Sequence, residues 1–282
     1  MNVTLLKNAL MSIKTAMEDA ISTATYSGNT YDNGQRAKEA LIRSKTLIGR
    51  LHEVVKISLK EVLQREARNY HINPPVGSSS PELTVAGLIK KKQQDVVVLM
   101  DDDYLQPETI SEGPLAGQLD PIGKEVAERS IVVGIRSQLS SVDKNFDTLM
   151  ERAFAETLNL RLRLPSLVMG EVYLLPVVEY DDVAMVENRV AWRPEPVKVS
   201  KFIQTFLAIS GRSSTTDLAQ LYKYERSALV LADFRESPPR VFLTLDELVA
   251  GGFVPHIFSG NFNLLSPKGF AEDIVAARLS RR

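Results

Sequence analysis

The chain has 282 residues, enough for one elaborated α/β domain with a smaller appendage. Hydrophobic residues make up 44% of it and charged residues 24%, a balance that supports a packed core and excludes a disordered chain. It has no cysteine, which excludes disulfides, thiolate metal sites and cysteine nucleophiles, and its net charge of -1 gives no overall attraction to nucleic acid.

The N-terminal quarter has helical periodicity. Apolar residues recur at helical spacing over residues 2–25 and again over 35–69, so we predict two amphipathic helices that form a helical arm, residues 1–69, for DNA binding or dimerisation. Between Arg36 and Arg68 there are nine Lys/Arg against four acids. This segment fits either a phosphate-binding patch or an ordinary solvated helix face.

Strands and helices alternate after this arm, which predicts an α/β protein. Proline, glycine and serine in residues 70–93 indicate a shaped loop. Short β-branched runs then predict buried strands, and longer apolar periodicities predict helices. The expected strands are 95–100, 131–136, 168–178, 228–234 and 240–243, and the expected helices are 142–161, 199–209 and 268–280.

Membrane and compartment signals are absent from this sequence. The N-terminal residues lack a long apolar region, and no run approaches the ~20 apolar residues that a membrane span needs. The lack of cysteine fits a reducing compartment. We therefore expect a cytoplasmic protein without a membrane partner.

An acid at the start of one predicted strand is the first candidate for chemistry. Asp95 precedes Val96, at the mouth of the run Val96–Leu99. Metal-dependent phosphodiester cleavage needs carboxylates that converge on the metal and a cation or polar group that orients water. Asp95 is either such a ligand or simply the acid that ends the preceding loop.

The next predicted strand ends Gly134-Ile135-Arg136-Ser137-Gln138, and Asn145 follows on the next helix. This segment resembles the E-x-K-S-Q segment of type II restriction endonucleases of the PD-(D/E)xK superfamily. The resemblance covers roughly residues 70–180. It departs at two positions, because Gly134 stands at the acid and Arg136 at the lysine. A guanidinium clamps phosphate charge but is too basic to act as a general base.

The resemblance implies a restriction-endonuclease-like mixed sheet core flanked by helices, with residues 70–282 as the catalytic core and its C-terminal extension. It also implies that another acid replaces Gly134. Glu156 is our first candidate, ahead of Glu151, although an Arg152–Glu156 pair at i, i+4 is also an ordinary helix salt bridge. Glu82 is a further candidate from the preceding loop.

On this resemblance the protein is a site-specific double-stranded DNA endonuclease that uses Mg²⁺, acts as a homodimer and has a possible cognate DNA methyltransferase. Asp95, Glu156 and Glu82 would hold the metal. The expected catalytic residues are Asp95, Arg136, Gln138 and Glu156, and the expected substrate-binding residues are Lys92, Ser137, Ser140, Lys144 and Asn145. The alternatives are a catalytically inactive DNA-binding or defence-complex assembly module with the same fold, and a helical scaffold without a DNA role.

Overall fold

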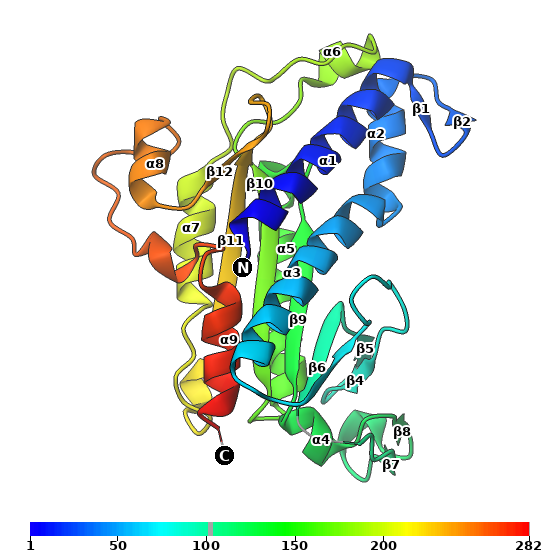
Figure 1. Cartoon of the computed structure of the whole chain (residues 1–282), viewed down its shortest axis with the longest axis vertical. Coiled ribbons are helices and arrows are strands. Elements are labelled where there is room, and N and C mark those ends of the chain that lie inside the picture. The colour runs from blue at the N-terminus through cyan, green and yellow to red at the C-terminus, as the bar shows by residue number, and fades with distance from the viewer. Residues whose placement is uncertain (101–103, 282) are drawn as a thin grey trace.

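A six-stranded mixed sheet forms the centre of the molecule (Figure 1). The computed structural model describes residues 1–100 and 104–281. Strand order across the sheet is β12–β11–β10–β9–β6–β3. The parallel strands are β9, β10 and β11, while β6 is antiparallel to β9, β3 to β6 and β12 to β11. The strands are β3 (Tyr70–Asn73), β6 (Val96–Met100), β9 (Ile131–Ser137), β10 (Val168–Pro176), β11 (Arg226–Asp233) and β12 (Arg240–Phe242).

Both faces of this sheet are covered, which is why its central strands read as apolar runs. Every residue of β6, β10 and β11 is buried. Side chains alternate between the faces along each strand. On β9, Val133 and Ile135 enter one hydrophobic core, and Val132 enters the other. The expected strands at 95–100, 131–136, 168–178, 228–234 and 240–243 are thus confirmed to within a few residues.

The N-terminal helices share a hydrophobic core with the first face of the sheet (Figure 1). Leu10, Leu51 and Leu59 share one core with Val98 and Val172 of the sheet. Their apolar stripes are therefore buried within the main fold and not held in reserve for a partner. The helices of this layer are α1 (Val3–Thr23), α2 (Gly34–Arg43), α3 (Thr46–Arg65), α6 (Asp182–Val186) and α9 (Phe270–Leu279).

The predicted helix 35–69 is two helices. The chain breaks between α2 and α3 at Lys45, which has a left-handed φ of 62°. Nor do its basic residues form one exposed patch. Lys38 and Lys56 are buried, and Lys56 donates to the carbonyl oxygens of Pro75 and Ser78 at 2.9 and 2.6 Å. Lys56 thereby fixes the Pro/Gly/Ser loop that follows β3.

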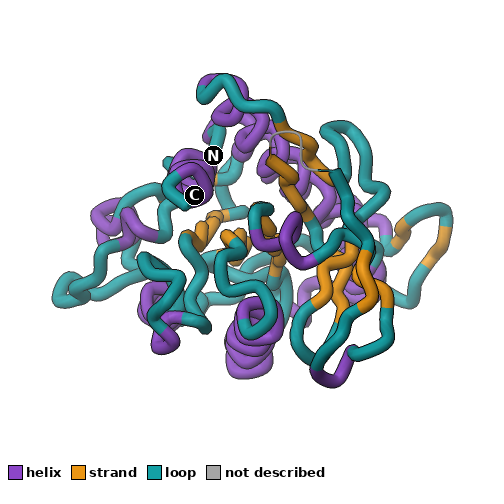
Figure 2. The backbone as a smooth tube through the Cα atoms, turned by 90° about the horizontal axis from the view of Figure 1, so that it is seen from below, coloured by secondary structure: helices purple, strands orange, loops and turns teal. Residues whose placement is uncertain are grey.

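A second helical layer packs on the other face, and Figure 2 shows helices on both sides of the sheet. Phe146 and Phe202 meet edge to face with ring centroids 4.9 Å apart, which joins the two main helices of this layer. The helices here are α4 (Lys124–Glu128), α5 (Phe146–Arg161), α7 (Val199–Ala208) and α8 (Leu245–Ala250). The expected helices at 142–161, 199–209 and 268–280 are confirmed as α5, α7 and α9.

The structure also contains small two-stranded sheets and 3-10 turns outside the six-stranded sheet. The segment expected as a loop, 70–93, in fact contains β3 and one of these small sheets. No helix in the described part of the chain is both long and apolar enough to cross a membrane. The short elements are β1 (Thr25–Tyr26), β2 (Asn29–Thr30), β4 (Thr84–Ala86), β5 (Lys91–Gln93), β7 (Glu108–Thr109), β8 (Leu119–Asp120), η1 (Gly113–Leu115), η2 (Asp143–Asn145), η3 (Leu218–Gln220) and η4 (Phe262–Leu264).

Candidate active site

Strand pairing brings Asp95 beside the degenerate motif. Residues Val96 to Val98 of β6 pair antiparallel with residues 131–133 of β9, so the mouth of β6 meets the second half of β9. Asp95 Oδ2 accepts a hydrogen bond from the backbone N–H of Ile135 at 2.7 Å. Asp95 therefore contacts the Gly134–Arg136 segment directly.

A buried carboxylate fills the space beside Gly134. Glu171 pairs directly with Gly134 across β10 and β9, and it is fully buried. A Cβ atom at position 134 would overlap Glu171 Oε2. The glycine is required here because the neighbouring strand supplies the side chain that occupies this place. The motif has no acid at position 134, but Glu171 of the neighbouring strand β10 places a carboxylate in the same space.

Arg136 joins two acids. Its Nη1 lies 3.1 Å from Glu171 Oε1, and its Nη2 donates to Glu156 Oε2 in a short contact. The predicted convergence of Arg136 and Glu156 is thus present. The alternative Arg152–Glu156 helix salt bridge is not among the ion pairs of the described residues; instead, Lys92 Nζ makes a second ion pair with Glu156 Oε1.

Asn159 on α5 positions the hairpin that carries Lys92. Its side-chain oxygen accepts from the backbone N–H groups of Ile89 and Lys90 at 3.0 and 3.2 Å, and its amide donates to the Lys90 carbonyl at 3.1 Å. Gly87 is needed because a Cβ there would overlap Asn159. Asn159 therefore has a structural role in anchoring this hairpin.

Burial dominates the electrostatics of this cluster. Desolvation raises the pKa of Glu171 to about 7, against the opposing effect of Arg136, and repulsion from Glu156 adds to the rise. Burial also disfavours the charge of Arg136, yet Glu171, Tyr224 and Glu156 together hold its pKa above the ordinary value. Three carboxylates, Asp95, Glu156 and Glu171, thus share this site with two cations.

The remaining predicted residues lie nearby to different degrees. The Gln138 amide donates to the Ser140 carbonyl, and Ser137 and Ser140 are half-buried just beyond Arg136. Lys144 and Asn145 are exposed in η2, where the Asn145 amide donates to the Ser141 carbonyl at 3.1 Å. Among the described residues, neither Lys144 nor Asn145 makes a hydrogen bond or ion pair with Arg136 or its acidic partners.

Glu82 is half-buried in the loop before β4. Burial lowers the pKa of His52, while Asp95 and Glu82 raise it, so both acids are near this imidazole. Among the described residues Glu82 makes no ion pair with Arg136 or Lys92. It lines a surface groove of about 610 Å³ together with Lys45, Ser80 and Gln93.

Glu171, Tyr173 and His52 were not among the site residues predicted from the sequence. The useful signal for Glu171 was its place inside a long apolar run, because a charge in a buried strand must be paired or functional. Tyr173 follows on the same face of β10, and its hydroxyl is buried without a hydrogen-bond partner in the described structure.

Magnesium fits the donor chemistry of this site. Across the described residues, no three His, Asp or Glu side chains converge closely enough to hold a metal ion by themselves. Magnesium usually takes one or two carboxylates and completes its shell with water and substrate phosphate. Neither buried oxygen of Glu171 accepts a hydrogen bond, because Arg136 Nη1 is close to Oε1 but not directed at it. Asp95 and Glu171 are the pair suited to that role.

The chain has no significant match among protein-family models, curated proteins or solved structures. The candidate site therefore rests on its own geometry.

Proposed function

We propose that this protein is a Mg²⁺-dependent, site-specific double-stranded DNA endonuclease of the type II restriction class, with a restriction-endonuclease-like core. One observation carries the proposal. Asp95 at the mouth of β6 bonds to Ile135, and Glu171 occupies the space that an acid at position 134 would fill. An acid at a strand start beside an acid and a cation on neighbouring strands is the constellation that the resemblance implies.

Different residues of the chain would bind the metal, neutralise phosphate charge and position the other side chains. Asp95 and Glu171 would hold magnesium, which when bound supplies Lewis-acid polarisation of a phosphoryl oxygen. Arg136 presents a guanidinium between two acids, suited to neutralise charge that develops on phosphate. Glu156 holds Arg136 and Lys92 in place through its two oxygens, so we assign it a positioning role in preference to metal binding.

Substrate contacts follow from exposure around the cluster. Lys90 and Lys91 are exposed beside Lys92 in the chain, Lys144 is exposed in η2, and Ser137 and Gln138 are half-buried at the end of β9. Exposed cations would contact DNA phosphates, and polar side chains would orient the scissile group. A homodimer would match twofold-symmetric DNA sites and cut both strands.

Digestion of plasmid and phage DNA by purified protein, with magnesium or with EDTA, tests this proposal directly. We expect discrete magnesium-dependent fragments with the wild type. Asp95→Ala and Glu171→Gln should each lower the cleavage rate by at least ~100-fold, since each removes a charged ligand of the reacting centre. Glu151→Gln, on the exposed side of α5, is the matched control and should cleave at the wild-type rate.

Two outcomes would contradict the enzyme proposal. Cleavage that survives both Asp95→Ala and Glu171→Gln would place the activity elsewhere or in a contaminant. Absence of cleavage across DNA substrates of varied sequence and methylation, with folded wild-type protein and magnesium present, would remove the activity itself.

A non-catalytic DNA-binding or assembly module is the second candidate, favoured by one specific observation. Glu156 and Glu171 are already paired with Arg136 and Lys92, so the cluster is close to charge balance without a metal. For such a module, DNA affinity should fall steeply with salt and be unchanged by magnesium or by Glu171→Gln.

A further inference from the structure

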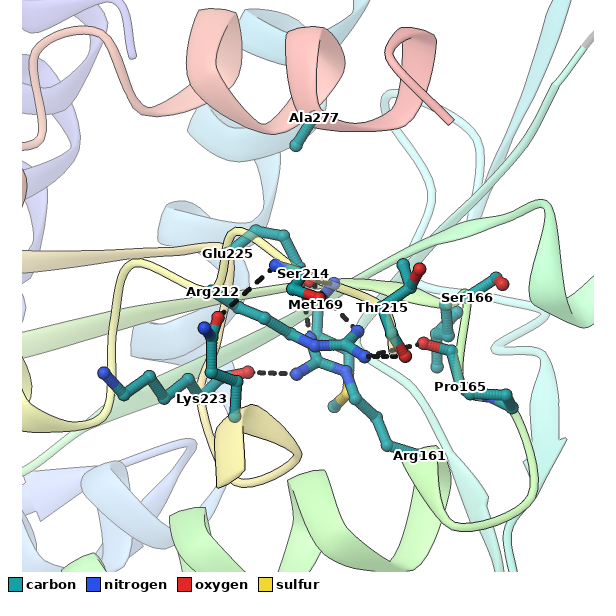
Figure 3. Close-up of polar contacts among 12 residues, drawn as sticks. Arg161, Pro165, Ser166, Met169, Arg212, Ser214, Thr215, Lys223, Glu225 and Ala277 are labelled. Carbon is teal, nitrogen blue, oxygen red and sulfur yellow. Dashed lines mark hydrogen bonds and ion pairs between the residues drawn. The ribbon is translucent and has the colours of Figure 1, made fainter. Parts of the chain in front are cut away.

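A second buried charge cluster lies at the start of β11, and Figure 3 shows it in close-up. Glu225, just before β11, is contacted by three arginines: Arg161 at 2.5 Å, Arg281 at 2.6 Å and Arg212 at 3.4 Å. The Met169 N–H also donates to Glu225 Oε2 at 2.6 Å. Three guanidinium groups thus share one carboxylate, which leaves a local excess of two positive charges.

This excess positive charge is unfavourable because the guanidinium groups are buried and repel one another. Burial lowers the pKa of Arg161 to about 9, with repulsion from Arg212 and Arg281 opposing the attraction of Glu225. The pKa of Arg212 is also lowered, mainly by burial and further by Arg281. The Nε atoms of Arg161 and Arg212 are buried without a hydrogen-bond partner in the described structure. A further anion beside them would relieve this repulsion.

The cluster borders an open pocket of about 580 Å³. Arg212 and Arg281 line it, while Arg161 is buried behind them. The side chain of Arg281 is 14% exposed, the most accessible of the three arginines, so it connects the cluster to solvent. The rest of the lining is small and largely hydroxylated: Ser166, Ser213, Ser214, Thr215, Ala277 and Ser280.

We propose that this pocket binds a phosphate-class oxyanion. Planar guanidinium groups suit tetrahedral oxyanions through paired N–H···O contacts, and serine and threonine hydroxyls donate to the remaining oxygens. Within the described chain, Glu225 is the only acid within ion-pair distance of these three arginines. The pocket volume admits a phosphate together with the first group that it esterifies. This inference does not rest on the proposed nuclease function.

Ala277 of α9 offers a test that removes no native polar contact. It lines the pocket, is half-buried, and faces the arginines in Figure 3. In Ala277→Glu a carboxylate would take the place of the bound anion. Ala277→Gln is the matched control, because it has the same length without the charge.

Thermal unfolding in sodium phosphate and in sodium chloride of equal ionic strength provides the readout. For the wild type and Ala277→Gln we expect phosphate, at about ten times its Kd, to raise Tm by about 3 °C over chloride. Ala277→Glu should lose this phosphate-specific shift and have a higher Tm than Ala277→Gln in chloride. The comparison also separates binding from general salting-out by phosphate, which acts equally on all three proteins.

Equal phosphate shifts in all three proteins, or no shift above chloride in the wild type, would overturn the proposal. The same assay with thymidine 5′-monophosphate against thymidine asks whether an esterified phosphate is accepted. If magnesium-free duplex DNA abolishes the phosphate shift, the site contacts the DNA backbone; if it does not, the ligand is a free phosphate compound. Either result is consistent with the oxyanion site, and the two results distinguish a DNA phosphate from a free phosphate compound as its ligand.

Discussion

Glu171 lies inside β10 and Glu225 directly precedes the neighbouring strand β11, yet their surroundings are opposite. Glu171 has one guanidinium nearby, and neither of its oxygens accepts a hydrogen bond. Glu225 accepts from three arginines and a backbone N–H. Both side chains are almost fully buried, so burial alone does not distinguish them. The number of cationic partners, and not the depth of burial, therefore decides whether a buried carboxylate has a deficit or an excess of positive charge around it.

The largest expected effect is the loss of the Glu225 charge. Glu225→Gln would leave Arg161, Arg212 and Arg281 without a counter-charge, and breaking a buried ion pair in this way costs about 3–5 kcal/mol of unfolding free energy. Urea unfolding at pH 7 measures it. Glu151→Gln on exposed α5 surface is the control, expected within about 0.5 kcal/mol of wild type. A loss of unfolding free energy as small as that of Glu151→Gln would show that the three arginines do not need Glu225 as a counter-charge.

The same substitution at Glu171 should raise the unfolding free energy instead of lowering it. Its pKa of about 7 exceeds the ordinary 4.5, so folding favours the protonated acid. Its stabilising contribution is complete below pH 4.5 and is lost as pH rises through 7. The charged groups facing it are Arg136, Glu156, Lys92 and Asp95.

Glu171→Gln should therefore be more stable than wild type at pH 8, without magnesium, by on the order of 3 kcal/mol. The advantage should disappear by pH 4. Urea unfolding of both proteins across this pH range measures it. A Glu171→Gln protein that is less stable than wild type at pH 8 would mean that the Arg136 ion pair outweighs the cost of burial.

A smaller effect is expected for Arg136→Lys. The guanidinium reaches Glu171 with one nitrogen and Glu156 with the other, and a lysine ammonium cannot span both. Loss of one charged contact should lower unfolding free energy by about 2 kcal/mol. Arg152→Lys, exposed on α5, is the control and should be near neutral. Equal stability of the two variants would show that the two-sided contact of Arg136 is not needed.

The sequence was sufficient for elements with strong local patterns. The runs Val96–Met100 and Ile131–Ser137 and the periodic stretch around Phe146 are each specified by neighbouring residues, and each forms the expected element. The break at Lys45 was missed because no glycine or proline marks its left-handed backbone. The strand β5, Lys91–Gln93, was missed because its polar residues gain their partners from β4 and, at Lys92, from Glu156.

The candidate site was predictable only where its members belong to a recognisable local pattern. Asp95, Arg136 and Glu156 were identified from the strand start and the degenerate motif, and the structure brings them together. Glu171 was missed because its relation to Gly134 depends on the register between β9 and β10, which no local pattern specifies. The cluster around Glu225 was missed for the same reason, since its arginines come from residues 161, 212 and 281.

The position of Glu171 within the sheet has a mechanical consequence. It lies in the interior of β10, which is hydrogen-bonded to β9 on one side and β11 on the other along most of its length. Its backbone is therefore among the least mobile in the molecule. Asp95, at a strand start, and Lys92, on a two-stranded hairpin, have fewer such restraints. Any adjustment that brings the charged groups together around a ligand must come from these two residues, with Glu171 as the stationary reference point.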